Sequence, residues 1–427
     1  MKKVVLGVVS IFVLLSVSFF GFAGGQGEPE SITGEVITLE VWVLSGHLSQ
    51  QWNQYIYQKW ETEKPEIKLN FLEIPEDEYE RKYYMSLQAK KAPDLISFWG
   101  ETFGDYVHSG AVAPMPDDLR TAFWDSGVYP EFRKIFDFDG KTYALNDNIG
   151  PYIMHFNKTM FSEAGLSNPP NTWDDFIDAA KKTTKYNEQG DVERVGYAIR
   201  HVGHIPGSVG KWLPFLFSAG GAFMDEDGQK VLFNDGAGRK ALGLYVDLIH
   251  KHKASSLEFP DPRNAFIDEL AAMQVSENIE RRLEKEAPDL DFGFALIPAA
   301  AGSESETVFD CNLFGVSPQS NHQREAWEHL IWLHEASRIK ERILMAKDVV
   351  PLRPATANDP AVTQLEFVRI ALVALEGANP YPVAPNFREV CGIFWDYAQR
   401  ALYAKMSVAD ALVEAERDAN EALARAR

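Results

Sequence analysis

The sequence VITLEVWV at residues 36–43 places an apolar side chain at every second position. That period of two, rich in β-branched residues, predicts a β-strand. Residues 48–60 then repeat apolar side chains at helical spacing, Pro65 stops that helix, and residues 67–71 alternate again. The order strand, helix, strand predicts a right-handed parallel crossover, so the folded body begins as an α/β layered domain.

Predicted helices and strands continue to alternate along the chain. A second helix over residues 76–90 leads into a short apolar run at 94–98 that is typical of a buried strand. Further candidate strands are residues 152–156, 196–200 and 292–297, and the candidate helices between them are 237–250 and 262–273. The predicted C-terminal helices are residues 323–334, 338–346, 363–375, 387–403 and 408–425. The pattern predicts two α/β halves followed by a helical C-terminal portion.

Composition limits the possible functions. The chain has 427 residues and a mass of 48.0 kDa, enough for about two to three domains. Its net charge of −20 repels phosphate backbones and anionic lipids, so we expect no nucleic-acid partner. The two cysteines, Cys311 and Cys391, are too few for a four-cysteine zinc site. Whether they form a disulfide is left open by the sequence.

The first 23 residues predict export. Two lysines precede an uncharged run over residues 4–20, and small residues end at Ala23, as in a secretory signal peptide cleaved after that residue. The run is long enough that an uncleaved membrane anchor remains an alternative. Residues 24–34 predict a flexible leader. No cysteine precedes Cys311, so a lipid-anchored N-terminus is excluded and we expect a periplasmic or secreted protein.

Motifs of catalysis are missing from the sequence. It contains no Gly-x-Ser-x-Gly elbow, no His-Glu-x-x-His, no Walker-type loop and no Gly-x-Gly-x-x-Gly. We therefore expect no enzyme activity, no cofactor and no metal. With 62 carboxylates, a glycosidase pair stays possible, but the sequence singles out none.

Aromatic residues carry the positive signal. They make up 12% of the chain. Trp42 lies on the polar face of its predicted strand, opposite Ile37, Leu39 and Val41. Trp99 directly follows the strand at 94–98, near Glu101. Ligands of open α/β sheets bind at the carboxyl ends of strands. A flat ring beside carboxylates suits a sugar, whose C–H face stacks while its hydroxyls pair with polar groups.

Several segments resemble one known family in the order in which that family carries them. They are PDLISFWG at 93–100, YVHSGAVAPM at 106–115, DGKTYAL at 139–145, PPNTWDDF at 169–176, GGAFM at 220–224 and FGVS at 314–317. This series is similar to the extracellular solute-binding proteins of family 1, the sugar receptors of ABC importers that include maltose-binding protein. The resemblance covers nearly the whole chain after the signal segment.

The resemblance implies the fold: α/β, a two-lobed periplasmic-binding-protein fold of the type II kind, with a hinge and a helical C-terminal portion. It implies a first lobe over residues 35–147 with 312–350, and a second over 148–310 with 351–427. Ligand would lie in the cleft, and the lobes would close around it.

The resemblance also implies site residues. Trp99 matches a cleft tryptophan, and Phe394-Trp395 resembles a pair whose tryptophan stacks on sugar, with core packing of Trp395 as the alternative. The other ligand-binding candidates are Trp42, Glu101, Asn148, Tyr152, Trp212, Glu277, Asn278 and Tyr381. Residues 276–279 read Ser-Glu-Asn-Ile where many relatives carry a glycine and a stacking tryptophan. This difference argues against a long maltodextrin-like ligand.

The sequence therefore predicts the substrate-binding component of an ABC importer, a monomer that binds a mono- or oligosaccharide and delivers it to permease subunits. One alternative is an exported glycosidase. A second is a binding protein for a polyol phosphate or a peptide, with Arg353 or Arg263 as a cationic anchor. A third is a membrane-tethered adhesin with a vestigial cleft.

Overall fold

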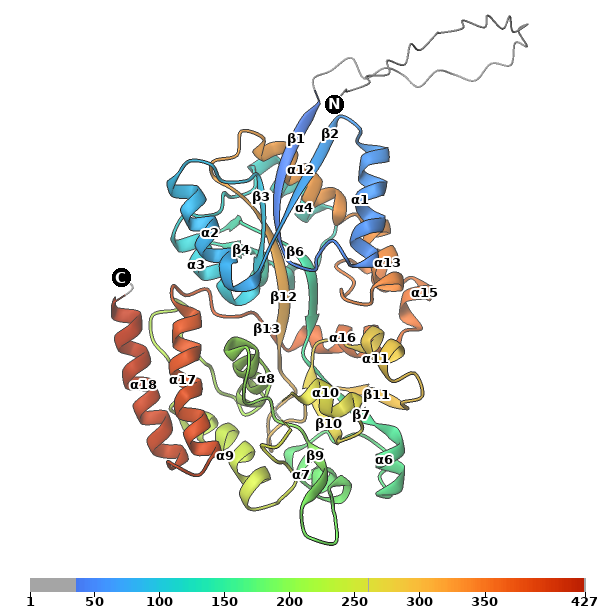
Figure 1. The fold of residues 1–427 in the computed structure, drawn as a ribbon, viewed down its shortest axis with the longest axis vertical. Helices are drawn as coiled ribbons and strands as arrows, with labels where there is room; N and C mark the ends of the chain where they lie inside the picture. The colour runs from blue at the N-terminus through green and yellow to red at the C-terminus, as the bar shows by residue number, and fades with distance from the viewer. Residues whose placement is uncertain (1–35, 260, 426–427) are drawn as a thin grey trace, which may run out of the picture. The chain divides into compact units, whose positions relative to one another are not determined.

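The computed structural model describes residues 36–259 and 261–425. The predicted signal peptide and leader lie outside these residues. Two large β-sheets organise the described chain, each with its own large hydrophobic core, and β4 (Asp137–Phe138) pairs with β5 (Lys141–Thr142) in a small third sheet. Figure 1 shows the two sheets with helices packed around each.

The first sheet is mixed. Its main path runs β13 (Ala378–Asn379), β12 (Thr307–Val316), β3 (Leu95–Trp99), β1 (Ile37–Leu44), β2 (Ile67–Ile74), and β6 (Leu145–Pro151) pairs with β12. Strand β1 is parallel to both β2 and β3, which confirms the predicted parallel crossover. Strand β12 runs antiparallel to β3 and to β6, so it enters the sheet from the other direction.

The second sheet has the order β11 (Phe292–Ala295), β7 (Ile153–Asn157), β10 (Ala271–Ser276), β9 (Val192–Tyr197), β8 (Lys185–Tyr186). Strands β9 and β10 are parallel, and β7 is antiparallel to both β10 and β11. All six side chains of β10 are buried, as expected for the central strand of a covered sheet.

Helices cover both sheets. Those with buried side chains in the first core are α1 (Gln51–Glu63), α2 (Glu76–Gln88), α3 (Phe103–His108), α4 (Asp117–Asp125), α5 (Arg133–Phe136), α12 (Gln323–Leu333), α13 (Ala336–Met345), α15 (Pro360–Thr363) and α16 (Glu366–Glu376). Those of the second core are α6 (Lys158–Glu163), α7 (Trp173–Thr183), α8 (Ile205–Phe217), α9 (Gly236–His250), α17 (Phe387–Leu402) and α18 (Val408–Arg425). The short helices α10 (Pro262–Ile267), α11 (Glu280–Glu286) and α14 (Pro354–Ala357) complete the set. The predicted helical C-terminal portion is confirmed, with α17 beside α18 (Figure 1).

The chain crosses between the two cores within single strands. In β12, Val308 belongs to the second core and Leu313 to the first. The lobe ranges given by the resemblance stay a prediction. Because α16 contributes Phe367 and Val368 to the first core, the packing favours a last boundary nearer residue 378 than residue 351.

Two expectations from local pattern differ from the structure. The helix predicted over residues 262–273 ends at Ile267, because Glu269 adopts a left-handed φ of 57°, and the chain then enters β10. The strand expected at 196–200 is β9, which ends at Tyr197. Cys311 and Cys391 are free and buried, so they form no disulfide. Over the residues that the structure describes, no helix is long and apolar enough to span a membrane.

Candidate ligand-binding site

Three neighbouring strands bring polar and aromatic side chains into one row. On β12, Asn312 pairs with Trp99 of β3 on one side and with Asn148 of β6 on the other. Residues opposite one another on adjacent strands point to the same face of a sheet. The backbone N–H of Asn312 also donates to Asn148 Oδ1 at 2.9 Å, which fixes that amide.

This row forms part of the wall of a cavity of about 490 Å³. That volume lies in the usual range for small-ligand sites. The lining comes from β3, β6 and β12 of the first sheet, from the segments that follow β9 and β10 of the second sheet, and from helices and loops of both halves: Glu76, Trp99, Glu101, Asn148, Ile149, Gly150, Tyr152, Arg200, His204, Gly207, Arg263, Glu277, Asn278, Asp310, Asn312, Asp348, Phe367 and Tyr381.

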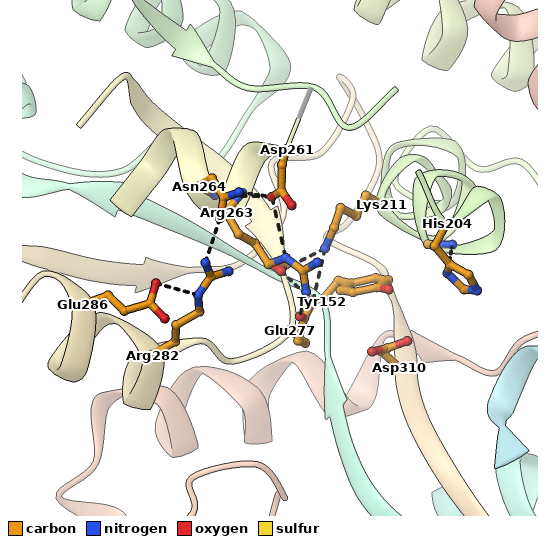
Figure 2. Close-up of polar contacts among 12 residues, drawn as sticks. Tyr152, His204, Lys211, Asp261, Arg263, Asn264, Glu277, Arg282, Glu286 and Asp310 are labelled. Carbon is orange, nitrogen blue, oxygen red and sulfur yellow. Dashed lines mark hydrogen bonds and ion pairs between the residues drawn. The ribbon is translucent and has the colours of Figure 1, made fainter. Parts of the chain in front are cut away.

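An ion-pair network around one buried lysine forms one side of the cavity. Lys211 on α8 is only 4% exposed, and its Nζ lies 3.1 Å from Glu277 Oε2 and 2.9 Å from Ser276 Oγ. Arg263 Nη1 donates to Glu277 Oε1 at 2.8 Å, and the Ser276 hydroxyl donates to Glu277 Oε2 at 2.6 Å. Figure 2 shows Lys211 and Arg263 converging on Glu277. Burial alone would raise the pKa of Glu277, but the two cations hold it well below its usual range.

Helix α8 approaches this network closely. Lys211 Nζ lies 4.6 Å above the centre of the Tyr152 ring, a cation–π contact. At Gly210, a Cβ atom would lie 2.5 Å from the Tyr381 hydroxyl and 2.9 Å from Tyr152 Cε2. Only glycine therefore allows the helix to meet these two rings.

Asp310 also lines the cavity, but its negative charge is less well neutralised than that of Glu277. Its carboxylate accepts a hydrogen bond from Tyr381 OH at 3.4 Å. Burial, together with the charges of Glu277 and Glu101, raises the pKa of Asp310 to about 6. Near neutral pH this side chain is therefore close to its titration, and a donor from a ligand would favour its charged form.

Glu101 is a second acceptor at the cavity. It is 4% exposed, and its Oε1 has no hydrogen-bond partner within the described residues, although His204 Nε2 lies 3.2 Å away. His204 is the N-cap of α8, where its Nδ1 accepts from the Gly207 N–H at 3.2 Å. Because His204 Nδ1 accepts, its Nε2 carries the hydrogen, so His204 is the nearest donor to this carboxylate oxygen, and both side chains line the cavity.

The structure brings seven of the ten predicted site residues to this cavity: Trp99, Glu101, Asn148, Tyr152, Glu277, Asn278 and Tyr381. Their contact with ligand stays a prediction. Glu277 is already occupied by its cations, and the Asn278 amide donates to the Lys347 carbonyl at 2.7 Å, so both act first as parts of the wall.

The other three predicted residues lie elsewhere. Trp395 is 0% exposed in the second core, where its Nε1 donates to the His201 carbonyl at 3.1 Å. Trp212 is also 0% exposed, with its ring centre 4.6 Å from that of Phe394. The stacking role predicted for both is therefore wrong, because the apolar spacing of α17 and α8 turns these rings into the core. Trp42 packs half-buried against the first core, outside the cavity lining.

Sequence reasoning missed several lining residues. The sequence does not predict Arg200, Asp310, Asn312 or Asp348, and it offers Arg263 only as a cationic anchor for a polyol phosphate or a peptide. Polar residues on either side of Cys311 in a long apolar strand were the available signal for Asp310 and Asn312. No comparable signal marks Arg200 or Asp348.

Two further features bear on the alternatives. Arg353 is not at the cavity, and its guanidinium donates to Ser126 Oγ at 2.9 Å and to the His334 carbonyl. Within residues 36–259 and 261–425, no three His, Cys, Asp or Glu side chains form a group suited to hold a metal ion.

Comparison with known proteins identifies the family. Residues 45–336 match the model of the bacterial extracellular solute-binding protein family. The chain belongs to this family.

Relatives within curated proteins are distant but extensive. A binding protein of Brucella abortus is 25% identical over 365 residues, covering 83% of this chain and 85% of that protein. An arabinooligosaccharide-binding protein of Bacillus subtilis is 26% identical over 258 residues, covering 58% of this chain and 55% of the relative.

Solved structures show the same fold. A solute-binding protein of Thermotoga lettingae bound to α-D-tagatose superposes with a TM-score of 0.78 at 22% identity, covering 91% of this chain and 100% of that chain. A cyclic α-maltosyl-1,6-maltose binding protein of Arthrobacter globiformis also gives 0.78, at 21% identity and with the same coverage. The two-lobed solute-binding fold predicted from sequence is thereby confirmed.

Proposed function

We propose that this protein is the exported sugar-binding subunit of an ABC importer, a monomer that holds a carbohydrate in the cavity beside Trp99 and delivers it to a permease. The observation that carries the proposal is the cavity itself. There the Trp99 indole shares a wall with the amide of Asn148 and with the carboxylates of Glu101 and Asp310.

The chemistry of this wall suits a sugar. The indole offers a flat apolar face, which a pyranose C–H face covers. The carboxylates of Glu101 and Asp310 can accept hydrogen bonds from sugar hydroxyls, and the guanidinium N–H groups of Arg200 can donate hydrogen bonds to them. Each stack contributes about 0.5–1.5 kcal/mol and each neutral hydrogen bond about 1 kcal/mol.

Charge favours a neutral ligand over a phosphorylated one. The lining holds five carboxylates, Glu76, Glu101, Glu277, Asp310 and Asp348, against two arginines, Arg200 and Arg263. Arg263 is already bound to Glu277, so it is a poor anchor for phosphate. An anion entering this cavity would meet more negative than positive charge.

Because the lining combines strands of the first sheet with segments that follow strands of the second, a bound sugar would touch both lobes and stabilise their closure. In that closed form the protein would be recognised by the permease. The names of several relatives support a carbohydrate ligand: they name an arabinooligosaccharide, diacetylchitobiose, α-D-tagatose and cyclic α-maltosyl-1,6-maltose.

A ligand screen tests the proposal. Melting temperatures are measured against mono- and oligosaccharides, a polyol phosphate and short peptides, and the positives are confirmed by calorimetry. We expect at least one carbohydrate to raise the melting temperature. The variant Trp99→Ala should weaken that binding about tenfold, whereas Trp42→Ala, another half-buried strand tryptophan, should leave it unchanged.

A response to the phosphate or the peptide alone would overturn the carbohydrate assignment. Release of reducing sugar from a bound oligosaccharide would instead favour the glycosidase alternative.

A further inference from the structure

A second cavity of about 610 Å³ lies next to the proposed sugar site. Its lining includes Glu80 and Tyr84 of α2, Asp105 and Tyr106 of α3, and Asn386 and Arg388 at the start of α17. It is therefore built from helices of both cores, just as the first cavity combines strands of the first sheet with Tyr152 and Tyr381 of the second core.

Two helical segments place the cavities side by side. Glu76 lines the first cavity and Glu80 the second, four residues apart on α2. Glu101 lines the first and Asp105 the second, four residues apart where the chain enters α3. At a rise of about 1.5 Å per residue, one helical turn separates such positions by about 6 Å.

Arg388 joins the two cavities directly. It lines the second cavity, and its Cζ lies 5.8 Å from the ring centre of Trp99, which lines the first. A chain molecule lying beside the Trp99 ring would therefore pass Arg388 to reach the second cavity.

Like the first cavity, the second is lined by aromatic rings together with carboxylates, an asparagine and an arginine. The rings of Tyr84 and Tyr106 lie 5.7 Å apart between centres. Tyr106 is 1% exposed, yet its hydroxyl has no hydrogen-bond partner among the described residues. A buried hydroxyl without a partner is costly unless water or a ligand satisfies it.

The charges of this cavity are largely compensated from within the protein. Arg388 Nη1 lies 2.6 Å from Glu80 Oε1, and Glu389 pairs with Arg425 at 3.1 Å. Asp105 accepts the Asn386 N–H at 2.6 Å. A neutral, hydroxyl-rich guest therefore fits better than an ion.

We propose that the second cavity is a further sugar subsite, so that the ligand is an oligosaccharide running from the first cavity past Trp99 and Arg388 to Tyr84 and Tyr106. This inference rests on the proposed carbohydrate function and adds the length of the ligand and the residues that read it.

The test is a chain-length series measured by calorimetry. The probes are arabino-, xylo-, malto- and chito-oligosaccharides of one to five units, with the wild type and the variants Tyr84→Ala and Tyr106→Phe. Tyr129→Ala is the control, because Tyr129 is also a half-buried tyrosine packed on the first core and lines neither cavity.

In the series that binds, we expect affinity to rise about tenfold or more between the disaccharide and the longer members. Tyr84→Ala should remove most of that gain while leaving the affinity for the shortest binding sugar within about twofold. Tyr106→Phe should remove a smaller part, and since it deletes only a hydroxyl, it tests the subsite even where Tyr84→Ala fails to fold.

Equal affinity at every length in the wild type would overturn the subsite while leaving the proposed function intact. An equal loss at all lengths in both variants would do the same. Failure of every carbohydrate to bind the wild type would overturn the proposed function itself.

Discussion

Replacing Glu277 with glutamine removes the carboxylate on which two cations of the cavity wall depend. Lys211 is 4% exposed and would keep only uncharged partners in the network: Ser276 Oγ, 2.9 Å from its Nζ, and the amide oxygen of the glutamine. Arg263 would keep Asp261, 3.8 Å away. The buried lysine is thus the group that bears the cost.

The size of the effect follows from that burial. Removing one partner of a buried ion pair costs about 3–5 kcal/mol in the free energy of unfolding, and because the Glu277 side chain is 29% exposed, the loss should lie near the lower end of that range. Lys211 limits the loss by releasing its proton, since burial already lowers its pKa and Glu277 is the main group that raises it. Holding a lysine neutral costs about 1.4 kcal/mol for each pH unit below about 10.4, hence about 5 kcal/mol at pH 7 and about 1 kcal/mol at pH 9.5.

The sign is set by linkage. In the variant the unfolded chain binds a proton that the native Lys211 has lost, so stability rises with pH up to about 10.4. The gap between wild type and Glu277→Gln should therefore shrink from about 3–5 kcal/mol at pH 7 to about 1 kcal/mol at pH 9.5. Urea unfolding at both pH values measures it.

The control is Glu286→Gln, the same substitution at a 3.0 Å pair with Arg282 in which both side chains are exposed. It should cost less than about 0.5 kcal/mol. Adding Lys211→Met to Glu277→Gln should recover part of the loss, because no buried ammonium remains. A loss below about 1 kcal/mol at pH 7, or an equal loss at both pH values, would refute the reasoning.

Three further outcomes follow from the same structure. Because the pKa of Asp310 is raised to about 6, the native state holds a proton that the unfolded chain releases, so the free energy of unfolding should fall by up to about 3 kcal/mol between pH 4 and pH 6. Asp310→Asn should flatten this pH dependence when it is measured by urea unfolding, and an unchanged slope of stability against pH would contradict the assignment. Trp395→Ala should lower stability by about 3–5 kcal/mol yet leave the sugar affinity of the folded protein unchanged, whereas a selective loss of binding would restore its stacking role. Burial raises the thiol pKa of Cys311 and Cys391, so a thiol reagent should modify both only after denaturation, and rapid labelling of the native protein would show that they are accessible.

Much of the architecture was available from local pattern. The alternation over residues 36–43, the helical spacing that follows and the stop at Pro65 led directly to the observed parallel pairing of β1 and β2. Trp99 was found because it follows a short apolar strand, and strand ends in such sheets are where ligands bind. Each of these signals is local, since it depends on neighbours within a few positions.

The positions of Trp395 and Asp310 were decided only in three dimensions. A tryptophan with apolar residues at helical spacing looks the same whether its helix turns it to a cleft or to a core, and only the packing of α17 against α8 and α18 buries it. Asp310 reaches the cavity only because β12 pairs with β6 and β3, which are distant from it in sequence. Period and composition fixed which segments are strands and helices, because those depend on nearest neighbours; the choice of which side chains share a cavity belongs to long-range packing, which no local pattern encodes.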